Sequence, residues 1–240
     1  MPHLILSDIH ANLEALEAVL ADAEGLYDRT LCLGDLVGYG ADPNAVVDWS
    51  RENVAAIVRG NHDKDCSSCD SLDHYRPLAR ASAGWTRTHL NEASLVYLRA
   101  MARGPLRFED FDLVHGSPAD EDEYLVGAAD VAPLLPDLGA QATFFGHTHI
   151  QGGFLLARSG VKTIAARGTV ELEPDHFYLI NPGSVGQPRD GDARAAYVLY
   201  WPKERIVEYR RVAYDVQKAA NKIRAAGLPA PLADRLMIGV

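Results

Sequence analysis

The 240-residue chain has few cysteines, no long apolar segment and no excess of basic residues. Its cysteines, Cys32, Cys66 and Cys69, are too few and odd in number for a disulfide framework. Cys66 and Cys69 have the spacing of half a zinc site or of a redox pair. Because no second pair follows at a suitable distance, we interpret them as two ordinary loop thiols.

No apolar run approaches the roughly 20 residues that a membrane-spanning helix needs, so we expect no membrane contact. The first residues lack the basic, apolar and cleavage regions of a secretory signal, which favours a cytoplasmic location. The formal net charge of −10 argues against a nucleic-acid partner, because sequence-independent binders neutralise phosphates with Lys and Arg. A small phosphorylated substrate remains compatible, since bound divalent cations would make one patch positive. Whether the chain forms a homo-oligomer is left open.

Short apolar segments alternate with helical patterns in the first part of the chain. The segments expected to be strands are 3–7, 30–33, 55–58, 111–114 and 143–145. Helices are expected after the caps Asn12 and Asp42, and residues 77–101 are expected to form two helices broken near Asn91.

The character of the sequence changes after residue 152, where strand patterns follow one another. The expected strands are 154–157, 161–165, 176–180, 196–200 and 206–209. A last helix is expected over 215–226, followed by a proline-containing tail. No repeat or linker marks a boundary, so residues 1–240 are predicted to form a single α/β domain with two facing sheets and helices outside.

Five polar motifs each end one of the apolar segments. They are Asp8-Ile9-His10, Gly34-Asp35, Gly60-Asn61-His62-Asp63, His115-Gly116 and Gly146-His147-Thr148-His149. One Asp or His at a strand end is usually just a satisfied polar residue. In open α/β sheets, however, ligands bind beyond the carboxyl ends of the strands, and all five motifs fall there. The coincidence indicates one shared site.

The motifs combine oxygen donors with imidazoles, a mixture that suits Mn, Fe, Co, Ni or Zn better than Mg or Ca. The candidate ligands are Asp8, His10, Asp35, Asn61, His115, His147 and His149. Asp35 is the natural bridge between two ions, because Gly34 lets the backbone approach closely. Ligands one residue apart either point the same way in an extended segment or straddle two ions from a loop. A coordinated water can reach a pKa of about 7, so no Ser or Cys nucleophile is needed.

These motifs, in this order, resemble the signature of the calcineurin-like metallophosphoesterase superfamily, in its compact prokaryotic phosphodiesterase and phosphatase branch. The segment 181–186, Asn-Pro-Gly-Ser-Val-Gly, is similar to a later loop of the family. The resemblance implies a four-layer α-β-β-α sandwich of two mixed sheets, with a dinuclear metal site at the C-terminal ends of strands. It also implies two divalent transition metals, manganese first and otherwise iron, zinc, nickel or cobalt. One metal would bind Asp8, His10, Asp35 and His149, and the other Asp35, Asn61, His115 and His147.

The resemblance further assigns roles and excludes one branch. His62 matches the catalytic position that stabilises phosphoryl oxygens or protonates the leaving group; the alternative is a surface histidine held by Asp63. The protein-phosphatase branch has Asp-Arg-Gly soon after its Gly-Asp, whereas this chain has Gly-Tyr-Gly at 38–40. Serine/threonine protein phosphatase activity is therefore not expected.

The predicted function is metal-dependent hydrolysis of a phosphate mono- or diester. A hydroxide bridging the metals would attack phosphorus in line, and His62 would assist departure of the alcohol. A dinucleoside-polyphosphate hydrolase is the alternative within this class. A non-catalytic metal-binding scaffold is the alternative outside it, disfavoured because every ligand is present. A nuclease is disfavoured by the acidic charge.

Substrate selectivity is expected to lie in the rim loops 65–75 and 118–125. The acidic run at 119–123 is interpreted as a solvated lid or loop. Arg189 could reach a substrate phosphate, because a guanidinium matches phosphate geometry. Pairing of Arg189 with Asp190 or Asp192 at the surface is the favoured interpretation.

Overall fold

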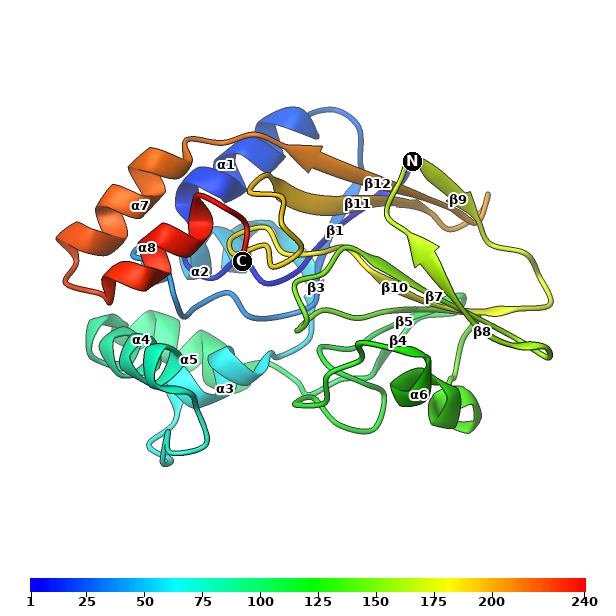
Figure 1. Cartoon of the computed structure of the whole chain (residues 1–240), viewed down its shortest axis with the longest axis horizontal. Helices are drawn as coiled ribbons and strands as arrows, with labels where there is room; N and C mark the ends of the chain where they lie inside the picture. Colours follow the sequence, from blue (N-terminus) through cyan, green and yellow to red (C-terminus); the bar gives the residue numbers. More distant parts are fainter.

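Two six-stranded mixed sheets form the centre of the computed structural model, which describes all 240 residues (Figure 1). The first sheet has the order β3-β2-β1-β11-β12-β9 and the second β4-β5-β6-β10-β7-β8. The first contains β1 (His3–Leu6), β2 (Arg29–Cys32), β3 (Val54–Ile57), β9 (Thr169–Glu171), β11 (Ala195–Trp201) and β12 (Ile206–Val212). The second contains β4 (Leu106–Arg107), β5 (Phe111–Leu113), β6 (Ala142–Phe144), β7 (Gly152–Ala157), β8 (Gly160–Ala165) and β10 (Phe177–Asn181).

Each sheet has a parallel part, and these parts carry the motifs. Strands β1, β2 and β3 run parallel, as do β5, β6 and β10. Parallel strands place their carboxyl ends at the same edge of a sheet, which gathers the loops after β1, β2, β3, β5 and β6. The predicted edge position of the motifs is therefore correct.

Helices cover the outer faces of both sheets. They are α1 (Leu13–Asp22), α2 (Pro43–Asn53), α3 (Asn61–Ser67), α4 (Pro77–His89), α5 (Glu92–Ala100), α6 (Ala128–Val131) with the 3₁₀ helix Ala132–Asp137, α7 (Val216–Ala225) and α8 (Ala230–Leu236). Alternation along β1 sets the layers: Leu4 and Leu6 pack in the core on the helical side, whereas Ile5 packs between the sheets against Phe144 and Ile180. This arrangement confirms the four-layer α-β-β-α sandwich.

The structure confirms the helices predicted after Asn12 and Asp42 and the break predicted near Asn91. The Asn12 side chain accepts from the Ala15 N–H at 3.1 Å, and Asn91 accepts from the Ser94 N–H at 2.8 Å. Asp42 precedes α2 but makes no capping bond, because its carboxylate accepts from Lys222 of α7 at 2.8 Å. Lys222, which is distant in sequence, thus binds the carboxylate that could otherwise cap α2.

The C-terminal tail contains a helix that the sequence analysis did not predict. Helix α8 begins at Ala230, with proline in its first turn, where a missing N–H costs nothing. Leu232, Ala233 and Leu236 are buried in a cluster with Ile223 of α7. Burial of this face, rather than local propensity, stabilises the helix. In Figure 1, α7 and α8 lie side by side at the left, in orange and red.

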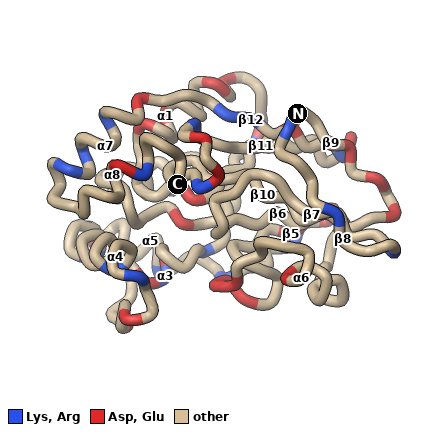
Figure 2. The backbone as a smooth tube through the Cα atoms, in the orientation of Figure 1, with Lys and Arg blue, Asp and Glu red and all other residues tan.

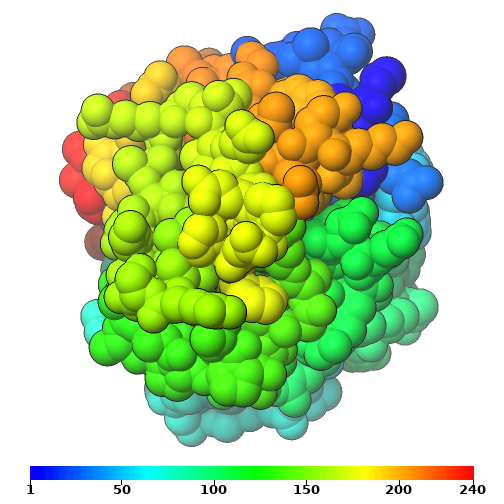
Figure 3. Space-filling model, turned by 90° about the vertical axis from the view of Figure 1, so that its right-hand side faces the viewer, coloured from blue at the N-terminus to red at the C-terminus, as the bar shows by residue number.

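The opposite end of the molecule is made of loops and hairpins. Viewed from that side, green and yellow segments form most of the surface, with the orange β12 region above them (Figure 3). Basic and acidic positions are interspersed along the chain, without a stripe of one sign (Figure 2). None of the helices combines the length and the apolarity that crossing a membrane requires.

Candidate metal centre

The motif loops have an unusual backbone conformation. Asp8, His10, Asp35, His147 and His149 all have positive φ angles, between 49° and 66°. Such angles are uncommon in residues other than glycine and persist only where the surroundings impose them. Here hydrogen bonds between loops impose them: the Asp8 N–H donates to the Gly34 carbonyl at 3.0 Å, and the His10 N–H to the Asp35 carbonyl at 2.9 Å.

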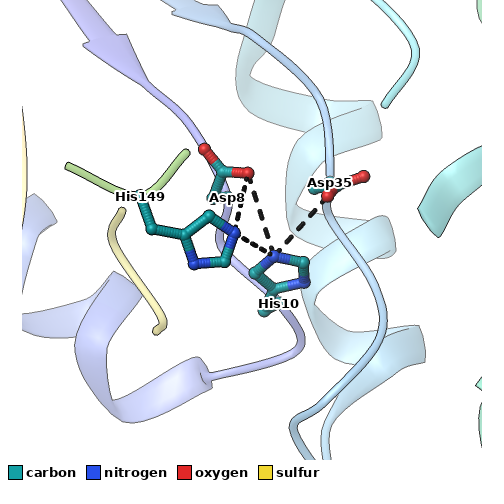
Figure 4. Close-up of side chains that lie close together, drawn as sticks. All are labelled: Asp8, His10, Asp35 and His149. Carbon is teal, nitrogen blue, oxygen red and sulfur yellow. Dashed lines mark hydrogen bonds and ion pairs between the residues drawn. The ribbon is translucent and has the colours of Figure 1, made fainter. Parts of the chain in front are cut away.

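A first cluster joins Asp8, His10, Asp35 and His149 (Figure 4). Each side chain offers a ligand atom, and these atoms lie within 4.8 Å of one another. His149 Nε2 is 3.3 Å from Asp8 Oδ1, and His10 Nε2 is 3.6 Å from Asp35 Oδ2. All are buried. Four buried donors that converge on one point form a candidate cation site.

A second cluster shares Asp35 with the first and adds His115 and His147. His115 Nε2 is 3.4 Å from Asp35 Oδ2 and 3.1 Å from Asn61 Oδ1. The same oxygen, Asp35 Oδ2, therefore faces a histidine of each cluster. The other Asp35 oxygen accepts the His62 N–H at 2.8 Å, which holds the carboxylate in this orientation.

Backbone carbonyls orient three of the imidazoles. The Nδ1 atoms of His10, His115 and His149 bond the carbonyls of Val37, Leu33 and Gln187 at 2.8, 2.7 and 2.6 Å. A carbonyl only accepts, so Nδ1 carries the hydrogen, and in its neutral form each ring has its lone pair on Nε2, toward the centre. Histidines that ligate metals are commonly held in this way.

Unsatisfied polar atoms show that the donor set fits a cation. His10 Nε2 and His149 Nε2 face each other at 3.1 Å, a contact that two lone pairs cannot stabilise. Asp8 Oδ1 and His147 Nε2 are buried without a hydrogen-bond partner. Buried polar groups are normally paired, and cations that bind these atoms would pair them. The donors thus fit divalent metal ions, as the chemistry of the motifs predicts.

Charges within the two clusters shift the pKa values of their side chains. Burial disfavours the charged form of His115, but the adjacent Asp35 carboxylate raises the pKa of His115 to about 10. Burial also opposes ionisation of Asp8, yet the nearby His149 holds the pKa of Asp8 below its ordinary value. The carboxylates are therefore ionised near neutral pH, as ligands must be.

Glycines permit the close approach of the motif loops. A Cβ atom on Gly34, whose φ is +93°, would overlap the Gly60 backbone. The Asp63 carboxylate then joins the two loops, accepting the N–H groups of Asp35 at 2.7 Å, Leu36 at 2.8 Å and Gly60 at 3.1 Å. The expectation that Gly34 allows a close backbone approach is met.

His62 lies inside the site rather than on the surface. Its side chain is nearly inaccessible, and its ring centroid lies 5.0 Å from that of His10 and 4.6 Å from that of Tyr39. Burial lowers the pKa of His62 to about 4; the Asp35 carboxylate opposes this shift and the Arg189 guanidinium adds to it. The alternative of a surface histidine held by Asp63 is wrong, because Asp63 bonds backbone instead.

The two pairs of ligands that are one residue apart, Asp8/His10 and His147/His149, are placed differently relative to the clusters. His147 and His149 belong to different clusters, so this pair straddles the centre from a loop. Asp8 and His10 belong to the same cluster, yet their left-handed backbone rules out the extended geometry in which alternate residues share a side. Long-range loop contacts, not strand geometry, bring Asp8 and His10 together.

Several supporting residues were not identified from sequence. Ser7 Oγ donates to Asp8 Oδ2 at 2.6 Å, and Asn61 Nδ2 donates to the Tyr75 hydroxyl at 2.8 Å. In the later loop, Asn181 Nδ2 donates to the Gly146 carbonyl, and Ser184 Oγ to the Asp8 carbonyl. Of these residues, only Asn181 and Ser184 could have been found from sequence, because the segment 181–186 is similar to a loop of the family.

The acidic run at the rim is a mostly exposed loop that two basic residues hold in place. Glu121 is only 9% exposed and accepts from Arg59 at 2.8 Å, while Asp122 accepts from Lys64 at 2.8 Å. The predicted solvated loop is thus confirmed for Asp120 and Asp122, whereas Glu121 is buried. Tyr124, which follows the run, is 51% exposed and lies over His147 with ring centroids 3.8 Å apart.

Cys66 is buried, Cys69 is exposed, and neither belongs to either cluster. Cys66 lies in α3 rather than in a loop, which corrects the interpretation of two loop thiols, whereas Cys69 follows the helix.

Comparison with known proteins places this geometry in a family. Residues 1–204 match the calcineurin-like phosphoesterase superfamily domain. The chain belongs to this superfamily. Membership supports metal-dependent hydrolysis of phosphate esters, and together with the buried Asp and His clusters it supports binding of divalent metal.

Two relatives match this chain over nearly its whole length. An uncharacterized protein of Methanocaldococcus jannaschii is 37% identical over 98% of this chain and 97% of its own. The crystal structure of a metallophosphoesterase from Sphaerobacter thermophilus is 38% identical, covers 100% of this chain and 99% of its own, and has a TM-score of 0.88. A hypothetical protein of Pyrococcus horikoshii OT3, 19% identical, covers 100% of this chain and 98% of its own with a TM-score of 0.81, which shows the same fold.

Proposed function

We propose that this phosphoesterase is a dinuclear metallohydrolase that cleaves small phosphate mono- or diesters. The position of Asp35 Oδ2, which faces His10 of one cluster at 3.6 Å and His115 of the other at 3.4 Å, is the observation that carries the proposal. A carboxylate so placed can bridge two ions. The proposed ligands are Asp8, His10, Asp35 and His149 for one ion, and Asp35, Asn61, His115 and His147 for the other.

The donor set favours manganese first, with iron, zinc, nickel and cobalt as alternatives. When bound, two such ions supply positive charge that polarises a phosphoryl oxygen and acidifies water near neutral pH. Two divalent ions and two aspartates leave a charge of about +2, which attracts an anionic ester. The centre needs no side-chain nucleophile.

His62 is the proposed catalytic residue. Its buried ring, next to His10 and Tyr39, is neutral near pH 7 and can donate one N–H hydrogen bond. In that form it can donate a hydrogen bond to a phosphoryl oxygen, and this stabilisation is the role proposed for His62, because only an imidazolium could protonate the departing alkoxide. Loss of one such hydrogen-bond donor typically lowers the rate by roughly 10²- to 10³-fold.

Metal loading and hydrolysis assays test the function together. Protein freed of metal and reloaded with Mn²⁺ should bind two equivalents by elemental analysis and cleave p-nitrophenyl phosphate or its bis-ester. Asn61→Ala and His147→Ala should abolish turnover while leaving a folded protein. Undiminished hydrolysis by Asn61→Ala would overturn the ligand assignment, and metal uptake without any turnover would indicate a scaffold.

A nucleic-acid substrate is disfavoured because basic residues form no stripe (Figure 2). A salt-sensitive DNA gel shift by the metal-loaded protein would reverse that preference.

A further inference from the structure

Arg189 does not pair with the acids that flank it. Asp190 accepts from Arg211 and from the Gln151 N–H, and Asp192 binds Arg194 at 2.6 Å. Both neighbouring carboxylates are therefore committed to other arginines. This corrects the favoured interpretation of Arg189 as one half of a surface ion pair.

The Arg189 side chain instead extends to the edge of the metal centre. Its Nη2 donates to the Tyr39 hydroxyl at 3.2 Å and to Gln187 Oε1 at 3.1 Å. The Tyr39 ring packs against His10 and His62, with centroid distances of 4.7 and 4.6 Å. The Arg189 backbone N–H also donates to the His149 carbonyl at 3.2 Å. Both ends of Arg189 thus contact residues that touch the proposed ligands.

The Arg189 guanidinium has a hydrogen-bond donor that lacks an acceptor. Its Nε is buried and has no acceptor, and its two present acceptors are neutral oxygens. Arginine has five N–H donors in a planar fork that matches phosphate oxygens. A half-buried cation with a free donor and no carboxylate partner is suited to an anionic ligand.

Helix α8 brings a second arginine close to Arg189. Burial and the charge of Arg189 lower the pKa of Arg235. Arg235 Nε donates to the Val240 main-chain oxygen at 2.7 Å. Arg189 and Arg235 thus place two interacting positive charges near Tyr39.

We propose that Arg189 binds an anionic oxygen of the substrate phosphate beside the metal centre and gives the protein a preference for phosphate monoesters over diesters. The inference rests on the proposed function. A monoester dianion carries twice the charge of a diester monoanion, so an added positive charge stabilises it more. Tyr39 and Gln187 act as positioning residues that hold the guanidinium.

Phosphate binding tests the contact without turnover. Calorimetric titration of the Mn²⁺-loaded protein with inorganic phosphate should give about 10- to 100-fold weaker binding for Arg189→Ala, the range that a charge-assisted hydrogen bond supports. Arg189→Lys should recover part of the loss. Arg194→Ala is the matched control, because Arg194 is exposed and paired with Asp192, and its phosphate affinity should equal that of the unsubstituted protein.

Kinetics with matched esters tests the selectivity. Arg189→Ala should lower kcat/KM for p-nitrophenyl phosphate more than for bis(p-nitrophenyl) phosphate, mainly through KM. An equal loss on both esters, or phosphate affinity unchanged by Arg189→Ala, overturns the proposal. If the unsubstituted protein cleaves neither ester, the proposed function fails, whereas the calorimetric comparison still decides whether Arg189 binds phosphate.

Discussion

The side-chain amide of Asn61 donates to the hydroxyl of Tyr75 at 2.8 Å, and this bond determines which end of the amide faces the metal centre. With its nitrogen held by Tyr75, Asn61 presents Oδ1 to the centre, 3.1 Å from His115 Nε2. A free amide could turn its NH₂ group inward, which cannot ligate a cation. Tyr75 is therefore a positioning residue for a proposed metal ligand.

Tyr75→Phe should weaken binding of the second cation by about 10- to 100-fold, as loss of a group that supports a metal ligand usually does. Titration with Mn²⁺ measures the affinity, and hydrolysis should recover at high metal concentration. Tyr97→Phe is the control, since it removes a hydroxyl that contacts Ser50 at 3.2 Å and touches no proposed ligand. Equal metal affinity in both variants would show that Asn61 needs no support from Tyr75.

Gly38→Ala should displace His62 without removing a ligand. The φ of Gly38 is +87°, and an added Cβ would lie 2.5 Å from His62 Nδ1. We expect kcat to fall about 100-fold, the lower range for loss of a hydrogen bond to a developing negative charge, while metal content stays unchanged. Gly25→Ala controls for backbone strain, because its φ is +73° and its Cβ would meet nothing within 4 Å. Full activity in folded Gly38→Ala would remove His62 from the mechanism.

Glu14→Gln should change the pH dependence of stability. Burial opposes ionisation of Glu14, but bonds from Lys222 at 2.7 Å and Lys218 at 3.1 Å hold its pKa below the ordinary value of 4.5. Because the folded pKa is lowered, the contribution is complete above about pH 4.5 and disappears as pH falls through the folded value.

Urea unfolding should therefore show Glu14→Gln less stable by about 1 kcal/mol at pH 7, with the difference shrinking below pH 4. Glu17→Gln, on the exposed face of the same helix, should leave stability unchanged within about 0.5 kcal/mol. A loss of equal size at pH 3 and pH 7 would mean that Glu14 contributes by packing rather than by charge.

Removal of metal should destabilise the folded protein. Ions that bind only the native state at 100 times their dissociation constant add about 2.7 kcal/mol. For a domain of this size, that corresponds to a fall in Tm of about 5–10 °C after chelation, restored by Mn²⁺. Asp35→Asn should be insensitive to chelator, and Arg194→Ala should respond like the unsubstituted protein. An identical Tm for metal-loaded and metal-free samples would contradict binding at these clusters.

Sequence reasoning succeeded where the signal was local. Apolar periodicity located most strands to within one or two residues, and the capping side chains of Asn12 and Asn91 marked helix starts correctly. It placed the helix start at Asp42 correctly but did not foresee that the side chain binds Lys222 instead of capping, and it missed α8, where burial against α7 replaces a local signal. In both cases, the deciding partner is distant in sequence.

The amino-acid sequence alone determined the donor chemistry of the site and the edge of the sheets where it lies, because residue type and short apolar segments encode both. Tertiary structure decided which donors share a point: His10 and His149 are 139 residues apart, and only the pairing order of the sheets brings their Nε2 atoms within 3.1 Å. Tertiary structure also leaves Arg189 without a carboxylate partner, because Asp190 pairs with Arg211 and Asp192 pairs with Arg194. Competition among distant charges follows from the folded arrangement, and no short segment of the chain specifies its outcome.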